Sequence, residues 1–423
     1  MFNQKLKVLL VASNFCRENE PHETYGASCL SAAFNEGRSK GQLRAEDSLE
    51  IFTCDLNKFL DRTTGIYSIH WEKIADEICR KVREGGYNVV AFSVFGWFEK
   101  AVKIASKEMA SWKVRPYIMM GGASIVKNEK KMQENFPYAD YFNVSYGEKI
   151  FGNLREYLSN QSKFLYDLPD FRSLQSPYLT GEIRLTEKIN SIRVETRRGC
   201  PFRCSFCKHR DTVNSRVYDI GCFDRHIREI ELFKSAGIKK LNILDPFFND
   251  KQGHGKLYLE LLRILDFNGE VTLQIRPELL TEDFVQEATL NKNLVFEIGV
   301  QSMEPEVLKL IRRGGEKTPE QVKEKAKLCN QYGIKTMVSL IYGLPLQSYD
   351  GFARDVDFFK ALNENIKVSA FPLQIYRGTF LDSKIDLTEY GLVKAENCFG
   401  IPEVVDSVNG DFHRMKNLAA QAH

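Results

Sequence analysis

The chain has 423 residues, of which 27% are charged and 43% hydrophobic, and its formal net charge is +3 at pH 7. A charge so close to balance does not argue for a nucleic-acid-binding surface. No apolar run reaches the roughly 18 residues that a membrane-spanning helix needs, so no membrane span is expected. The length favours two or three domains.

The first 150 residues alternate between short apolar strands and helical segments. Strands are expected at 7–12, 49–54, 88–94, 116–120 and 141–144. Continuously apolar strands separated by helices are typical of a parallel sheet that is covered on both faces. Such sheets bind ligands at the carboxyl ends of their strands. The candidate binding residues at those ends are Ser13, Asn14, Ser93, Gly96, Trp97, Gly121, Gly122, Tyr146, Gly147 and Glu148.

Three cysteines lie close together at the spacing Cys-x-x-x-Cys-x-x-Cys: Cys200, Cys204 and Cys207. Three thiolates can hold three corners of a [4Fe–4S] cluster and leave the fourth iron open for a small chelating ligand. The alternative is a zinc site with His209 as the fourth ligand. Zinc sites more often combine a Cys-x-x-Cys pair with a distant second pair, which this sequence lacks.

The other cysteines favour a different reading. Cys79 and Cys329 fall on the apolar faces of amphipathic helices, and Cys29 and Cys54 lie in apolar runs. Buried, reduced thiols fit these positions. Many unpaired cysteines and the absence of a signal peptide predict a reducing cytoplasmic location.

From residue 191 the alternation of strand and helix resumes, with strands expected at 191–196, 240–244, 271–275, 294–300, 336–341 and 368–371. One helix between them is well marked, with Thr318 as N-cap, Pro319 at the first helical position and Gln321 closing a capping box. Six βα units predict a barrel-like sheet, whose chemistry belongs at the carboxyl-end rim of the strands.

The cysteine spacing, with Phe206 between the last two cysteines, resembles the radical S-adenosylmethionine (SAM) superfamily. The resemblance implies a partial (β/α)6 barrel, in which the open iron binds SAM and its reductive cleavage yields a 5′-deoxyadenosyl radical. It also implies SAM-binding roles for residues at the strand ends. These would be Phe206 beside the adenine, Asp245 near the amino end, Arg276 for the carboxylate or the substrate, Glu297 and Gln301 near the ribose, and Gly343 along the adenine.

The N-terminal strand ends resemble the cobalamin-binding Rossmann-like domain of one large radical SAM class. The strand ending in Ser93, the Gly121-Gly122 turn and the segment 146–148 carry the likeness. That family's Asp-x-His-x-x-Gly motif is absent, and His22 is a loop histidine at the wrong spacing. The implied organisation is a cobalamin domain (1–154), a connector (155–188), a radical SAM barrel (189–380) and a helical or irregular tail (381–423).

The commonest chemistry in that class is C-methylation of an unactivated carbon, so the resemblance implies a cobalamin-dependent methyltransferase. Cyclisation, rearrangement or epimerisation, with or without cobalamin, remains open. So does a binding protein whose Fe–S cluster is structural. The expected partners are a small-molecule or peptide substrate and an external one-electron reductant of the flavodoxin or ferredoxin type.

Overall fold

The computed structural model describes residues 4–61, 67–159, 162–209, 216–362 and 365–422. It divides into two compact units. The first contains Met1–Ile189, Ile220–Glu229 and Cys398–Gly400, and the second contains Asn190–Asp219, Ile230–Asn397 and Ile401–His423. The first unit thus includes all of the segment 155–188 that we expected to be a connector. None of the described helices is long and apolar enough to cross a membrane.

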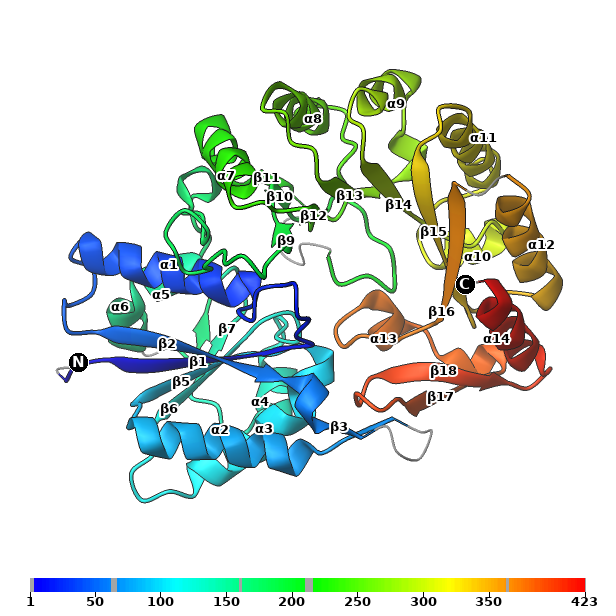
Figure 1. Cartoon of the computed structure of the whole chain (residues 1–423). Coiled ribbons are helices and arrows are strands. Elements are labelled where there is room, and N and C mark those ends of the chain that lie inside the picture. The colour runs from blue at the N-terminus through cyan, green and yellow to red at the C-terminus, as the bar shows by residue number, and fades with distance from the viewer. Residues whose placement is uncertain (1–3, 62–66, 160–161, 210–215, 363–364, 423) are drawn as a thin grey trace. The chain divides into compact units, whose positions relative to one another are not determined.

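The core of the first unit is a six-stranded sheet in the order β2-β1-β5-β6-β7-β8, and every neighbouring pair is parallel (Figure 1). All five strands expected from the sequence are present. The strands are β1 (Lys7–Asn14), β2 (Ser48–Asp55), β5 (Val89–Ser93), β6 (Tyr117–Gly121), β7 (Tyr141–Asn143) and β8 (Phe164–Leu165). The helices are α1 (Tyr25–Ser39), α2 (Trp71–Gly85), α3 (Glu99–Ala110), α4 (Glu129–Asn135), α5 (Glu148–Gly152) and α6 (Leu154–Ser159).

Both faces of this sheet are buried, which explains why its strands are continuously apolar. Leu9 and Val11 of β1 pack into a core with α2 and α3. Val8 and Leu10 point to the opposite face and pack with α1 and α5. All four side chains are at most 1% exposed. Each buried side chain removes apolar surface from water, which stabilises the fold by roughly 25 cal/mol for each Å2 buried.

The strand order creates a topological switch point between β1 and β5, because the chain leaves β1 towards β2 on one side and continues through β5 on the other. The crevice outside the carboxyl ends at such a point is the usual ligand position in open parallel sheets. Here those ends are Ser13-Asn14 and Ser93. Shorter elements of the first unit are η1 (Leu56–Phe59), β3 (Leu60–Asp61), β4 (Ser68–Ile69), η2 (Gly96–Phe98) and η3 (Phe171–Ser173).

The second unit contains six parallel strands that neighbour one another in chain order. This is the arrangement expected of a partial barrel. The strands are β9 (Ser191–Val194), β12 (Lys240–Ile243), β13 (Glu270–Ile275), β14 (Leu294–Gln301), β15 (Lys335–Tyr342) and β16 (Ile366–Pro372). In Figure 1 the intervening helices line one side of these strands. They are α8 (His254–Ile264), α9 (Glu282–Thr289), α10 (Pro305–Leu310), α11 (Thr318–Gln331) and α12 (Tyr349–Lys360), while α7 (Phe223–Ser235) is shared between the two units.

Two expectations from the sequence are wrong in detail. The tail was expected to be helical or irregular, but it contains an antiparallel hairpin. It consists of α13 (Phe380–Lys384), η5 (Leu387–Tyr390), β17 (Leu392–Glu396), β18 (Pro402–Ser407) and α14 (Asp411–Ala422). Thr318 is also the first helical residue of α11 and not its N-cap. Its hydroxyl accepts a hydrogen bond from the backbone N–H of Gly315 (2.9 Å), and this bond joins the turn that precedes the helix to the first helical residue.

The Gly122 turn generates a stability prediction. Gly122 has a φ of +93°, and a Cβ there would lie 2.7 Å from the backbone nitrogen of Val94. Gly122→Ala should therefore destabilise the first unit by roughly 2–3 kcal/mol through strain and collision alone. Gly26→Ala is the matched control, because Gly26 lies in α1 with nothing within 4 Å, and this change should be neutral or stabilising. Urea unfolding of both variants measures the difference, and equal midpoints would contradict the close approach.

Candidate functional site

The three clustered cysteines lie on a loop whose two ends are paired. The loop follows β10 (Arg197–Arg198), which pairs antiparallel with β11 (Tyr218–Asp219). In its middle, the backbone N–H of Ser205 donates to the carbonyl of Ile311 (2.8 Å), and its carbonyl accepts from Leu381 N–H (2.9 Å). Because the ends and the middle are all held, the cysteines are placed by the fold and not by the loop alone.

Each of the three sulfurs has an N–H donor. Cys200 accepts from the backbone of Phe202, Cys204 from the Arg276 guanidinium (3.7 Å), and Cys207 from the backbone of His209 (3.4 Å). Burial raises the pKa of the Cys200 thiol, and it raises that of Cys207 to about 11. N–H···S bonds of this kind stabilise metal-bound thiolates. Three thiols with three donors therefore fit a cluster with three protein ligands.

Asp245 holds the base of this loop. It follows β12, is completely buried, and accepts hydrogen bonds from the backbone N–H groups of Thr196 (2.8 Å) and Arg197 (3.0 Å) and from the Thr196 hydroxyl. His254 Nε2 lies 3.0 Å from the same hydroxyl. Both oxygens of Asp245 thus accept hydrogen bonds from the chain that leads into the loop, and Asp245 fixes the strand-to-loop connection. The expected contact with the amino end of SAM stays a prediction.

Arg276 is joined to the cysteine loop. Its guanidinium lies over the ring of Phe202 (3.5 Å to the centroid) and within hydrogen-bond distance of the Cys204 sulfur. Nη2 donates to the carbonyl of Arg313 (3.2 Å), and Nε lies 3.4 Å from Glu278 Oε2. The expected contact with the SAM carboxylate or the substrate stays a prediction.

The open face of the second sheet carries the expected polar residues of β14. Phe296 and Ile298 are buried, and Phe296 packs against Phe284 of α9, whereas Glu297 between them is only half-buried, as the alternation of a strand predicts. The Glu297 carboxylate accepts a hydrogen bond from Gln274 on β13, the partner that a buried charge needs. Gln301 ends the strand at a φ of +71°, and its amide folds back over Gly299.

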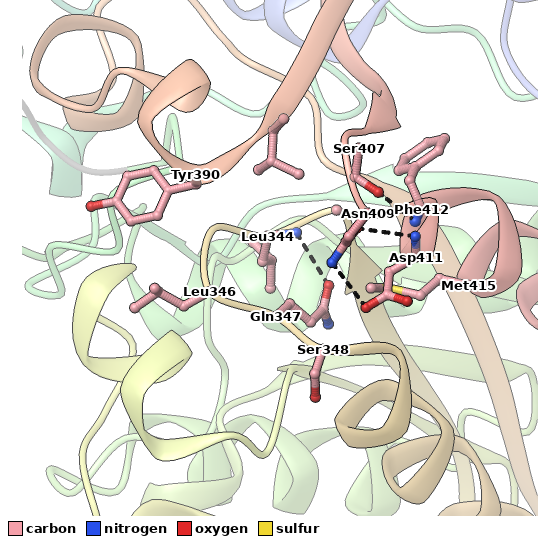
Figure 2. A pocket seen from close by; sticks show the side chains of 12 residues that line it. Leu344, Leu346, Gln347, Ser348, Tyr390, Ser407, Asn409, Asp411, Phe412 and Met415 are labelled. Atoms are coloured by element: carbon pink, nitrogen blue, oxygen red, sulfur yellow. Dashed lines mark hydrogen bonds between the residues drawn. The ribbon is translucent and has the colours of Figure 1, made fainter.

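Gly343 follows β15 and lines a pocket of about 240 Å3 (Figure 2). Its φ is +79°, and a Cβ there would meet Val404 at 3.0 Å and Phe412 at 3.1 Å, so the residue packs towards the C-terminal segment. The polar side chains around the pocket bond to neighbouring groups. Gln347 bridges Leu344 N–H (3.1 Å) and the carbonyl of Ile341 (2.9 Å), as Figure 2 shows in part. Phe206, on the cysteine loop, is half-buried.

In the first unit, Ser13 has a notable environment. Its side chain is 8% exposed, and its hydroxyl has no hydrogen-bond partner among the described residues. Leaving a buried hydroxyl unpaired is costly, so an unpaired one at the switch point fits a position where a ligand group binds. Half-buried Asn14 and Ser93 lie at the same strand ends. The Cβ position of Gly121 lies in ordinary contact with Asn143.

The remaining candidates of this unit lie in the loops after β5 and β7. Trp97 stacks on Phe95 (4.8 Å between centroids), next to Gly96 in η2. Tyr146 packs edge-on against Phe171 (5.2 Å). Gly147 and Glu148 are buried at the start of α5. A Cβ at Gly122 would collide with the Val94 backbone, so the fold itself requires a glycine here, whether or not a ligand binds nearby. His22 is exposed.

Sequence reasoning missed four residues of the loop environment: Thr196, Phe202, Gln274 and Arg313. Arg313 is 6% exposed, lies 3.1 Å from Glu278 Oε1 and donates to the carbonyl of Gly299. No motif marks it, and only its neighbours in space give it a role. In the described part of the chain, no three His, Cys, Asp or Glu side chains converge as they would around a single metal ion. None of the ten cysteines forms a disulfide bond, and Cys29, Cys54, Cys79 and Cys329 are buried as expected.

Comparison with known proteins identifies the second unit's class. Residues 194–359 match the radical SAM superfamily. This segment contains the cysteine loop, the last residue of β9 and the whole of β12, β13, β14 and β15. The chain therefore carries a radical SAM domain.

Two curated relatives extend the likeness at low identity. Tryptophan 2-C-methyltransferase of Streptomyces laurentii is 25% identical over 252 residues, which is 56% of this chain and 40% of that protein. The chain thus matches less than half of that relative's length. The tRNA-2-methylthio-N(6)-dimethylallyladenosine synthase of Buchnera aphidicola is 23% identical over 76% of this chain and 75% of its own.

Two solved structures share the fold of nearly the whole chain. The radical SAM methyltransferase TsrM of Kitasatospora setae, with cobalamin and a [4Fe–4S] cluster bound, matches 92% of this chain and 80% of its own (TM-score 0.65, 17% identity). The cobalamin-dependent SAM radical enzyme OxsB, with aqua-cobalamin and SAM bound, matches 98% and 66% (TM-score 0.68, 15% identity). The predicted fold class, a Rossmann-like domain followed by a partial (β/α)6 barrel, is confirmed, as is the resemblance to the cobalamin-binding radical SAM class.

The buried Asp245 carboxyl generates a prediction about pH. Burial raises its pKa from 3.8 to about 7, against the hydrogen bonds from Thr196 and Arg197, and the charge of Glu195 adds to the rise. Between about pH 4 and pH 7 the folded chain then binds a proton that the unfolded chain releases, so wild-type stability falls as pH rises through that window.

The side chain of the Asp245→Asn variant does not titrate, and its amide keeps one oxygen that can accept hydrogen bonds. The melting temperature of this variant relative to wild type should therefore rise from about pH 5 to pH 7 and level off by pH 8, with a rise that corresponds to about 1.4 kcal/mol for each pH unit below pH 7. Thermal unfolding across this range measures it. A difference that does not vary with pH would show that the carboxyl titrates normally.

Proposed function

We propose that this chain is a cobalamin-dependent radical SAM enzyme that methylates an unactivated carbon of a small-molecule or peptide substrate. The observation that carries the proposal is the cysteine loop: three thiols, each with an N–H donor, held at the carboxyl-end rim of a partial barrel. Bound there, a [4Fe–4S] cluster and SAM would supply the reactive radical. Cys200, Cys204 and Cys207 would hold the cluster.

The second sheet offers groups to orient SAM beside that loop. Glu297 is charged, half-buried and on the open face, and Gln274 fixes its carboxylate. Gln301 and Phe206 are half-buried at the same rim. With Asp245 and Arg276 occupied elsewhere, Glu297 is the strongest remaining candidate for a polar contact with SAM. The electron would come from an external flavodoxin- or ferredoxin-type reductant. Ten cysteines that form no disulfide support a reducing cytoplasmic location.

Support for cobalamin comes from the first unit. Its strand order places Ser13, Asn14 and Ser93 at a switch point, and the Ser13 hydroxyl lacks a protein partner among the described residues. TsrM and OxsB, which share this fold, have cobalamin bound. The exposed His22 is not part of the proposed site.

Ser13 allows cobalamin binding to be separated from folding. Removing an unpaired buried hydroxyl should leave the stability of apoprotein equal or higher. Ser13→Ala should therefore keep its melting temperature but bind hydroxocobalamin several-fold more weakly, because a group that the ligand pairs with is lost. Equilibrium dialysis followed by corrin absorbance measures the affinity.

Thr272→Val is the matched control, since Thr272 in β13 also has a buried hydroxyl without a partner in the described structure. It should leave cobalamin affinity unchanged. If Ser13→Ala bound hydroxocobalamin as tightly as wild type, Ser13 would not be part of the site. If wild-type protein bound none, the first unit would be one that does not bind cobalamin.

Product stoichiometry tests the reaction itself. Methyl transfer through cobalamin uses one SAM as methyl donor and a second as radical source. Turnover should yield S-adenosylhomocysteine and 5′-deoxyadenosine in about equal amounts, measured by chromatography of one reaction. Deoxyadenosine without S-adenosylhomocysteine would instead identify a cyclase, rearranging enzyme or epimerase. An iron–sulfur protein that produces neither compound would be a binding protein with a structural cluster.

A further inference from the structure

The cysteine loop lies beside an unbalanced pair of guanidinium groups. Arg276 and Arg313 both contact Glu278, at 3.4 and 3.1 Å, and each is at most 13% exposed at its side chain. Two positive charges and one negative charge leave one positive charge in excess next to Cys204. Coulomb interactions are stronger at such a buried position than at the surface, because the effective dielectric constant is lower there.

Arg276 reaches the loop in two ways at once. Its guanidinium stacks on Phe202, which lies between Cys200 and Cys204, and one N–H points to the Cys204 sulfur. Phe202 in turn meets Phe247 edge-on (5.6 Å), and Arg197 lies over Phe247 (5.9 Å). The donor to the Cys204 sulfur is a side chain, the Arg276 guanidinium. The other two sulfurs accept from the backbone N–H groups of Phe202 and His209, which a change of side chain leaves in place unless the new residue is proline.

We propose that Arg276 is a positioning residue that raises the reduction potential of the cluster held by Cys200, Cys204 and Cys207. This rests on the proposed function. Reduction adds one electron, and so one negative charge, to the cluster. Net charge and hydrogen bonds to the sulfurs are among the quantities that set the potential of an iron–sulfur cluster. A nearby excess positive charge and an N–H···S bond both favour the reduced form.

Glu278 has the opposite effect in this account. Its carboxylate neutralises part of the charge on the two arginines, so it lowers the potential that they would otherwise produce. The proposal therefore predicts shifts of opposite sign for two neighbouring residues. A role in holding the loop, or in gripping the SAM carboxylate, predicts no such pair of shifts in protein without SAM.

The test is a redox titration of anaerobically reconstituted full-length protein, without SAM, with dithionite as electron donor and electron paramagnetic resonance of the reduced cluster as readout. Arg276→Gln should lower the potential enough to change the oxidised-to-reduced ratio at least tenfold at fixed potential. That change corresponds to about 59 mV for a one-electron couple. Arg276→Lys keeps the charge but not the planar stack, and should recover part of the shift. Glu278→Gln should raise the potential.

Arg312→Gln is the matched control. Arg312 stacks on Phe380 (3.4 Å) and is exposed, and in the described part of the chain its guanidinium is on that ring and not on a cysteine sulfur. It should leave the potential unchanged. An unchanged potential in Arg276→Gln, or an equal shift in Arg312→Gln, overturns the proposal. If Arg276→Gln holds too little iron to titrate, Glu278→Gln decides: a rise supports the proposal, and no rise overturns it. Wild-type protein without a cluster would refute the proposed function instead.

Discussion

The buried carboxyl of Asp245 connects the sheet to the cysteine loop. It lies just after β12 and accepts hydrogen bonds from the backbone N–H groups of Thr196 and Arg197. These two residues lead from β9 into the loop. A fully buried carboxyl is costly unless its oxygens are bonded, and here the loop's own backbone supplies the bonds. Losing this contact would release the start of the loop from the end of β12 and leave the bonds at Ser205 and Arg276 to hold its middle. The positions of the three thiols therefore depend in part on Asp245.

The strands could be predicted from the sequence because a strand that is buried on both faces is a continuous run of apolar residues. β1, β5 and the strands from β12 to β16 appear where runs such as 7–12 and 336–341 indicated. The sequence also predicted the buried face of α2, including Cys79, because the helical spacing of apolar residues can be recognised without knowing which elements pack against the helix. The sequence did not predict the hairpin of β17 and β18, because β17 is mostly exposed, β18 is mostly half-buried, and each strand has a single fully buried residue.

Side-chain roles at the rim were harder to predict for a physical reason. Asp245 and Arg276 both follow strand ends, and sequence position alone makes them equally available to a ligand. Only the tertiary structure shows that Asp245 turns back to Thr196 and that Arg276 stacks on Phe202. Glu297 was predictable in one respect: a charge inside an apolar strand requires a partner, and Gln274 is that partner. Arg313 carries no motif and could be found only in three dimensions.

The central claim is that three cysteines hold a [4Fe–4S] cluster with one iron left open. Electron paramagnetic resonance of the dithionite-reduced, reconstituted wild-type protein, recorded with and without SAM, tests it directly. The account predicts a spin-1/2 cluster signal whose g-values change when SAM is added, because SAM binds the open iron. A cluster signal that SAM leaves unchanged, or a protein that binds zinc and no iron–sulfur cluster, would contradict it.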